Sequence, residues 1–307
     1  MGRRAPIIAC VSAPVANATL DNDNNAQIRI RWNGENMCVA GCEAKVRAAL
    51  SRRGFFTGAA AAGFAATAVP APAAETRSFS KVVDLTHTMS PDFPTFLGKP
   101  GIEMEREFEF KKDRFNLFWW RIIEHAGTHL DAPIHFSESG LSAEKLAVEQ
   151  LVVPLVVVNV VYQAEQDADY LLSREDVAKW EAKYGRLPAG CCVAMHSGWG
   201  ELVAADPARF EGRDVNGTMH FPGFAPETAA WLLKERQVAG IAVDTMSLDH
   251  GPSRTFRTHQ LWLPSGRWGL ENVANLGKVP EAGATLVVGA AKVKDSTGGL
   301  ARVMALV

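Results

Sequence analysis

Three histidines and one aspartate recur within residues 125–136, which read HAGTHLDAPIHF. Every second position is polar or a turn-forming residue, and the positions between are Ala, Thr, Leu, Ile or Phe. A period of two is typical of a β-strand that packs one apolar face inward and turns the other toward a cavity. The pattern therefore predicts a strand that presents imidazole and carboxylate groups on one face.

A helix is the alternative interpretation, because it would place His125 and His129 one turn apart, as in zinc-protease helices. Gly127 and Pro133 both disfavour a helix, and no Glu follows His125. The strand interpretation is therefore preferred.

Imidazole and carboxylate groups together suit zinc, manganese or iron, so this stretch is a candidate metal site. His129 and Asp131 would lie about 7 Å apart on one face of a strand, close enough to bind one ion. The alternative is a polar edge strand whose histidines contact only water.

The outer histidines require the chain to bend. His125 and His135 would be about 33 Å apart in a straight strand, too far for one site. Gly127 permits the unusual φ that would fold His125 back, and Pro133 interrupts the hydrogen-bond ladder before His135.

The pattern H-x-G-T-H-x-D-x-P-x-H resembles the signature of the metal-dependent cyclase family, which includes bacterial kynurenine formamidases and isatin hydrolases. It fixes seven residues in a window of eleven. Further matches are the Asp-rich turn at residues 244–251, a later His, and the ENVANL segment at 271–276. Matches at 196–199 and 221–223 extend the similarity across roughly Val82 to the end of the chain.

The resemblance implies specific roles. It implies five metal ligands, which are His125, His129, Asp131, His259 and Glu271, and it implies that His135 is the acid or base. Without the resemblance, His259 is equally consistent with a surface residue. Glu271, which we expect to open a helix, is then equally consistent with a helix N-terminal charge.

The resemblance also implies a swivelling β/β/α domain, usually assembled as a homodimer or homotetramer. The chain departs from the family at residues 92–96, where DFPTF replaces the Trp-Pro-Gly-Asp type of segment found near the substrate in formamidases. This departure leaves the substrate open. Aromatic residues that could line a substrate site are Phe93, Phe96, Trp119, Trp120 and Trp199, although aromatics in a chain of this size are more often core.

The expected chemistry is hydrolysis of a C–N amide bond in an arylformamide or a cyclic amide, with one or two Mn²⁺ or Zn²⁺ ions. A divalent ion lowers the pKa of water from about 16 toward 7, and His135 would carry the proton. The alternatives are a lactone-type ring-opening or ring-closing cyclase and a non-catalytic exported metal-binding protein. A cupin-type oxygenase is disfavoured because its His-x-His and glycine spacings are absent.

The amino-terminal part resembles a twin-arginine export signal. SRRGFF at residues 51–56 precedes an uncharged, alanine-rich run at 58–69, and Ala-Pro-Ala at 71–73 offers a cleavage site. The alternative is a disordered Ala/Pro linker. We expect residues 1–36 to lie before a start at Met37, residues 37–73 to be the signal, and residues 74–307 to be the hydrolase domain. The partners would then be the export machinery and a small-molecule substrate, with the mature protein periplasmic or secreted.

Composition excludes other classes of function. Of 307 residues, 47% are hydrophobic and 21% are charged, which is ordinary for a globular protein. The net charge of -2 gives no sign of the positive surface that nucleic-acid-binding proteins carry. The sequence has no Walker or dinucleotide-binding glycine loop. The run at 58–69 is well short of the roughly 20 residues of a stable membrane anchor.

Elsewhere the pattern mixes strands and helices without a repeat, which indicates an α/β or α+β class. We expect strands at 81–85, 155–161, 190–196, 240–243, 285–292 and 300–306, and a hairpin at 102–110 and 115–124. Helices are expected at 142–151, at 226–236, and from a capping box at Ser173 and Asp176 to Gly185. The adjacent Cys191 and Cys192 are expected to be buried thiols that do not bridge each other.

Overall fold

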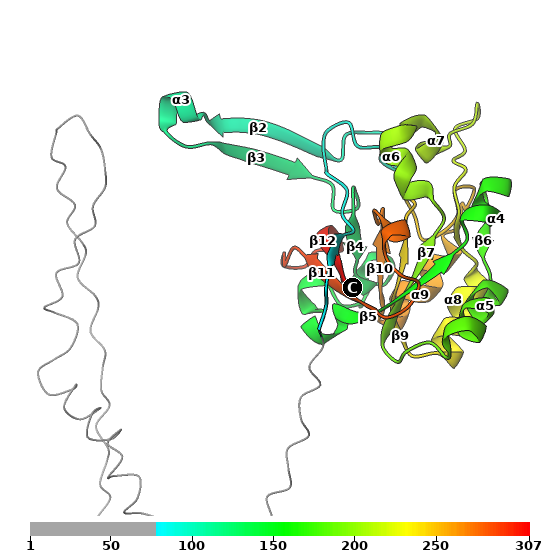
Figure 1. Cartoon of the computed structure of the whole chain (residues 1–307). Helices are drawn as coiled ribbons and strands as arrows, with labels where there is room; N and C mark the ends of the chain where they lie inside the picture. Colours follow the sequence, from blue (N-terminus) through cyan, green and yellow to red (C-terminus); the bar gives the residue numbers. More distant parts are fainter. Residues whose placement is uncertain (1–77) are drawn as a thin grey trace, which may run out of the picture. The chain divides into compact units, whose positions relative to one another are not determined.

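A closed β-barrel forms the centre of residues 78–307 (Figure 1). These are the residues that the structure, a computed structural model, describes. The strand order is β1-β12-β11-β5-β7-β9-β10-β4, and β12 also pairs with β4, which closes the sheet. The strands are β1 (Val82–Asp84), β4 (His129–Asp131), β5 (Val152–Asn159), β7 (Cys191–His196), β9 (Val238–Val243), β10 (Trp268–Glu271), β11 (Ala284–Ala290) and β12 (Gly298–Leu306). The expected mixed α/β class is confirmed.

Strands β5, β7, β9 and β10 are parallel, and their side chains alternate between two hydrophobic layers. In β5, Leu155 and Val157 belong to the cluster that also contains residues of β4, β10, β11 and β12. Val156 and Val158 pack with the helices outside the barrel. Continuous apolar runs such as β5 are typical of strands buried on both faces. Cys191 and Cys192 divide between the same two layers and are free and buried, as expected.

Helices cover the outer face of these parallel strands (Figure 1). They are α5 (Arg174–Tyr184), α8 (Pro226–Glu235) and α9 (Arg257–Trp262). The helices α4 (Val161–Gln166), α6 (Leu202–Ala205) and α7 (Pro207–Glu211) instead pack in a third cluster, which also contains Trp199 and Phe221. The expected capping box is present at α5, where Ser173 and Asp176 exchange side-chain and backbone hydrogen bonds and Gly185 follows the last turn at φ 91°. Cap chemistry is local, which explains why the sequence predicts this helix well.

Residues 142–151 do not form the expected helix. They form two 3₁₀ helices, Ala143–Lys145 and Val148–Gln150, with extended backbone at Leu146 and Ala147. Ala143 and Leu146 are buried in the barrel cluster, whereas Val148 is 68% exposed. Burying these side chains takes precedence over local helix propensity.

A β-hairpin arm extends away from the barrel (Figure 1). It consists of β2 (Ile102–Phe108), the short helix α3 (Phe110–Asp113) and β3 (Leu117–Ile122). All six residues of β3 are exposed. The expected hairpin is therefore confirmed, and its last strand leads directly to the His125 segment.

The remaining strands are short: β6 (Leu171–Leu172) pairs with β8 (Gly223–Phe224). Further 3₁₀ helices are Pro133–Phe136, Trp199–Glu201, Leu263–Ser265 and Leu276–Lys278. Within residues 78–307, no helix combines the length and the apolarity needed to cross a membrane.

Candidate metal centre

The histidine-rich stretch is a strand over three of its residues, and it bends on either side of them, as the sequence predicted. Strand β4 runs from His129 to Asp131 and lies between β10 and β12. The chain bends at the two positions that the sequence indicated. Gly127 has φ 62°, and Pro133 begins the 3₁₀ helix that carries His135. This bend returns His125 to the carboxylate of Asp131.

Glu271 ends strand β10 and does not open a helix, which corrects that expectation. It pairs with His129 across the β10–β4 ladder. Asn272 then adopts a left-handed conformation at φ 55°, which Asn tolerates better than most residues and which ends the strand. Barrel closure thus requires a strand where local sequence favoured a helix.

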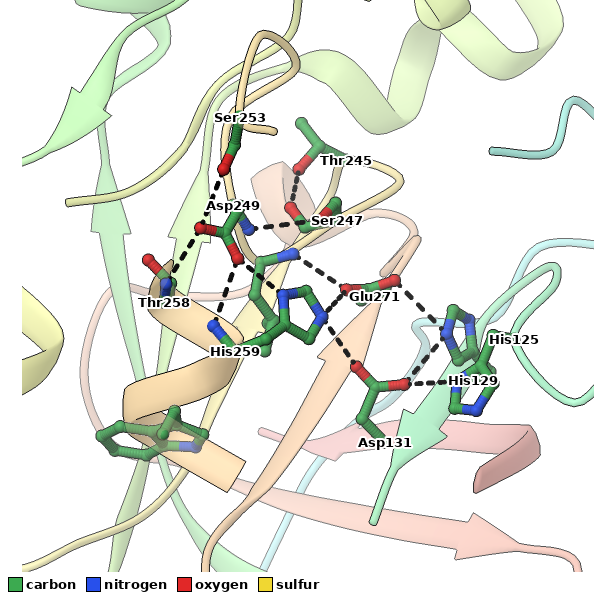
Figure 2. A network of polar contacts seen from close by, with 12 residues as sticks. His125, His129, Asp131, Thr245, Ser247, Asp249, Ser253, Thr258, His259 and Glu271 are labelled. Carbon is green, nitrogen blue, oxygen red and sulfur yellow. Dashed lines mark hydrogen bonds and ion pairs between the residues drawn. The ribbon is translucent and has the colours of Figure 1, made fainter. Parts of the chain in front are cut away.

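Five side chains from four segments converge on one point (Figure 2). Asp131 Oδ1 lies 2.7 Å from His125 Nδ1 and 3.2 Å from His129 Nε2. Asp131 Oδ2 lies 3.4 Å from His259 Nε2. Glu271 contacts His129 Nε2 at 3.3 Å and His259 Nε2 at 3.0 Å. Potential ligand atoms within 4.8 Å of one another form two groups that share Asp131: His125, His129 and Asp131, and Asp131, His259 and Glu271.

Hydrogen bonds at Nδ1, on the side away from the cluster, fix the ring orientations of His129 and His259. His129 Nδ1 lies 2.9 Å from the carbonyl oxygen of Gly127, to which it must donate. His259 Nδ1 lies 2.6 Å from the carboxylate of Asp249, which also accepts from the backbone N–H groups of Thr258 and His259. In both rings the lone pair is therefore on Nε2, which faces the carboxylates.

His125 is oriented in the same manner through two further residues. Thr297 Oγ1 lies 2.5 Å from the carboxylate of Glu124 and therefore donates its only hydroxyl proton there. The same oxygen must then accept from His125 Nε2, at 2.8 Å. The lone pair of His125 is consequently on Nδ1, which faces Asp131.

Three lone pairs and two carboxylates facing one another require a proton or a cation between them. Burial alone would lower the pKa of His129, but the carboxylates of Asp131 and Glu271 outweigh it and raise that pKa to about 10. Burial would also raise the pKa of Asp131, yet hydrogen bonds from the histidines hold it well below its usual value. His129 Nε2 and Asp131 Oδ2 are buried without a hydrogen-bond partner of good geometry. These nitrogen and oxygen donors fit a divalent metal ion, which would take the place of the protons.

His135 lies beside this cluster. Its ring stacks on that of His125, with centroids 3.7 Å apart and an interplanar angle of 19°. Burial lowers the pKa of His135 to about 4, so the ring is neutral at neutral pH. His135 belongs to neither of the two groups of ligand atoms found among residues 78–307.

Comparison with known proteins decides the family. The model of the Cyclase family matches residues 83–250, which is more than half of the chain. This chain belongs to the Cyclase family.

Similar proteins are matched over most of their length. Isatin hydrolase from Roseibium aggregatum is 31% identical over 244 residues, 74% of this chain and 92% of that protein. Kynurenine formamidase from Erythrobacter litoralis is 26% identical over 231 residues, 74% of this chain and 94% of that protein. The solved structure of isatin hydrolase A from Ralstonia solanacearum has a TM-score of 0.69 at 34% identity, covering 74% of this chain and 92% of that chain.

The aromatic residues expected near the substrate lie in different places in this Cyclase-family chain. Phe93 and Trp199 are buried around Phe210: the Phe93 and Phe210 rings are 6.4 Å apart, and Trp199 Nε1 donates to the carbonyl oxygen of Phe210. Trp119 is 64% exposed on the arm. Phe96 is half-buried, and its ring lies 5.9 Å from that of Phe256.

Several residues that complete the site were missed in the sequence. Asp249 lies in the Asp-rich turn that the sequence indicated, but nothing in its spacing predicted that it would hold His259. Its neighbour in that turn, Asp244, instead accepts from the backbone and hydroxyl of Ser197 in the core. Thr297 lies 172 residues from His125, and no local signal connects the two.

Proposed function

We propose that this protein is a metal-dependent hydrolase of a C–N amide bond, acting on an arylformamide or a cyclic amide. The observation that carries the proposal is the convergence of three imidazole lone pairs on two buried carboxylates, with a neutral imidazole beside them. The relatives named isatin hydrolase and kynurenine formamidase support an amide as the substrate.

The metal would be held by His125, His129, His259, Asp131 and Glu271. When bound, the ion supplies a Lewis acid that lowers the pKa of water from about 16 toward 7. We propose Mn²⁺ or Zn²⁺ because imidazole and carboxylate ligands suit both ions. Metal analysis of the purified protein identifies the ion and counts it.

His135 would move the proton during the reaction. A ring nitrogen of the neutral imidazole takes a proton from the attacking water, whose oxygen bonds to the carbonyl carbon. The C–N bond then breaks, and His135 returns the proton to the leaving nitrogen. An arylformamide gives formate and an aryl amine, whereas a cyclic amide gives one ring-opened product.

The variant His135→Ala separates an enzyme from a metal-binding protein. A positioned acid or base contributes about 10²- to 10⁴-fold. We expect turnover of N-formylaniline and of isatin to fall by that factor while the metal content stays near the parent value. His220→Ala is the matched control, because His220 pairs with Asp169 in a partly exposed position. Loss of metal from His135→Ala would make His135 a ligand, and an inactive metal-loaded parent would favour the binding-protein interpretation.

We further propose that the protein is exported with the aid of the residues 37–73 signal, which lies outside the described residues. The paired arginines, the short apolar run and the small-residue site support this proposal. Amino-terminal sequencing of the mature protein should begin within a few residues of Ala74. A mature protein that retains residues 1–36 would contradict it.

We also propose a homo-oligomer, dimer or tetramer, in which the arm packs on a second copy. The support is the exposed apolar surface of β3, which includes Trp119 and Trp120 at 64% and 60% exposure. A two-stranded hairpin is marginally stable in water by itself, so packing against another surface would stabilise it.

A further inference from the structure

Two phenylalanine rings, Phe136 and Phe256, lie beside the imidazole of His259, and a third ring, Phe96, lies beside that of Phe256. The ring centroid of Phe136 lies 4.7 Å from that of His259, and the centroid of Phe256 lies 6.0 Å from it. Phe256 is in turn 5.9 Å from both Phe136 and Phe96. All three phenylalanines are half-buried, so each residue keeps part of its surface accessible.

The three rings come from separate segments, two of which also carry His135 and His259. Phe136 directly follows His135 in the same 3₁₀ helix, and Phe256 is the N-cap of α9, which carries His259. Phe96 lies in the loop before β2, where Arg213 donates to its carbonyl oxygen at 2.8 Å. An aromatic surface therefore adjoins both the proposed proton carrier and a proposed metal ligand.

The backbone of Phe256 is strained. Its φ of 48° and ψ of 45° place it in the left-handed region, which a bulky residue rarely occupies. Elsewhere in residues 78–307, the non-glycine residues at positive φ are all polar: Arg114, Asn272, Asn275 and Asp295. Strain of this kind is characteristic of functional sites, where the position of one side chain matters more than local stability.

We propose that Phe96, Phe136 and Phe256 form the surface that binds the planar ring of an aryl amide, and that Phe256 is its main specificity-determining residue. This inference rests on the proposed function and specifies the substrate class. Aromatic rings prefer offset-stacked or edge-to-face contacts with other rings, and a saturated ring of the same carbon number lacks the planar π-face that these contacts need.

The experiment compares hydrolysis of N-formylaniline and N-formylcyclohexylamine by variants at position 256. The two substrates differ in intrinsic reactivity, but this difference is common to all variants, so the change in the ratio of their kcat/KM values reports the ring contact. Phe256→Asn removes the ring and tolerates the left-handed backbone. We expect the ratio to fall about 3- to 10-fold in Phe256→Asn.

Two further variants control for indirect effects. Phe256→Tyr keeps the ring and should keep the ratio within about twofold. Arg114→Gly removes another positive-φ side chain, on the arm, and should leave the ratio unchanged. Bound metal is measured in every variant, so displacement of His259 would be detected separately from loss of the ring contact.

The outcomes separate the two proposals. A metal-loaded parent that hydrolyses both substrates, with an unchanged ratio in Phe256→Asn, overturns the inference and leaves the proposed function intact. A metal-loaded parent that hydrolyses neither of these substrates nor isatin overturns the proposed function. The surface is then tested by equilibrium binding of benzoate and cyclohexanecarboxylate. A preference of the parent for benzoate that is lost in Phe256→Asn supports the inference. Equal binding of both ligands by the parent, or a preference that Phe256→Asn retains, overturns it.

Discussion

Asp249 lies behind His259, a proposed metal ligand, and fixes the orientation of its ring. Its carboxylate accepts from His259 Nδ1 at 2.6 Å and from the backbone N–H of Thr258 and His259. These contacts fix the tautomer of His259 and direct its lone pair toward Asp131 and Glu271. Carboxylate–histidine–metal arrangements of this kind also raise the basicity of the ligand.

We therefore expect Asp249→Asn to weaken metal binding about 10- to 100-fold while the fold is retained. The amide keeps the shape of the carboxylate but loses its charge. Competition with a chelator measures the affinity, and circular dichroism checks the fold. Asp169→Asn is the matched control, because Asp169 accepts from the ring of His220 in a partly exposed position. Unchanged affinity in Asp249→Asn would show that Asp249 does not position His259.

At the residue scale, the sequence predicted the site residues that lie close together in the chain. His129 and Asp131 follow from strand geometry, and the bend that brings in His125 was anticipated from Gly127. His259 and Glu271 entered only through the family resemblance, because strand pairing across the barrel brings them to β4. Thr297 and Phe256 could not be predicted, since their roles depend on contacts between distant segments.

At the element scale, local chemistry predicted α5 better than it predicted the region around the metal site. The Ser173–Asp176 capping box and Gly185 fix both ends of α5 without any tertiary contact. Residues 142–151 and Glu271 were assigned to helices, but burial in the barrel and strand pairing determine their conformations. The elements nearest the site are thus those in which tertiary packing overrides propensity.

The pairing of Glu181 in α5 with Arg236, the C-cap of α8, gives a pH-dependent prediction. Two hydrogen bonds of 2.8 Å join the side chains, and they hold the pKa of Glu181 below its usual value of 4.5. Because the folded-state pKa is lowered, the stabilisation is complete above the unfolded-state pKa and disappears as the pH falls through the folded-state pKa.

Glu181→Gln should therefore lower the free energy of unfolding at pH 7 by about 1 kcal/mol, a value reduced for partial exposure. Denaturant unfolding of both proteins measures the difference, which should stay constant down to about pH 5 and shrink below it. Glu138→Gln, at an exposed position outside the helices, is the control, for which we expect little change. A difference independent of pH down to pH 3 would show that the Glu181 charge is not the cause.

At the scale of the whole molecule, barrel closure builds the site, and we propose that the arm provides a surface for assembly. The variant Trp119→Ser/Trp120→Ser should have a lower mass in solution than the parent, because it removes two large apolar side chains from the proposed contact. Light scattering coupled to size-exclusion chromatography measures the mass. Tyr162→Ser is the control, since Tyr162 is 73% exposed on α4. A parent that is monomeric, or a variant of unchanged mass, would contradict the proposed role of the arm.

The measurement that tests the central claim most directly is the hydrolysis of N-formylaniline by protein that is stripped of metal and then titrated with Mn²⁺ or Zn²⁺. The stripped parent should be inactive, and its rate should rise with added ion and saturate. Asp131→Asn, which removes the carboxylate shared by both groups of ligands, should retain its fold but not recover activity over the same range of ion concentration. Full activity of the stripped parent, or equal recovery by Asp131→Asn, would contradict the assignment of this cluster as the metal centre of an amide hydrolase.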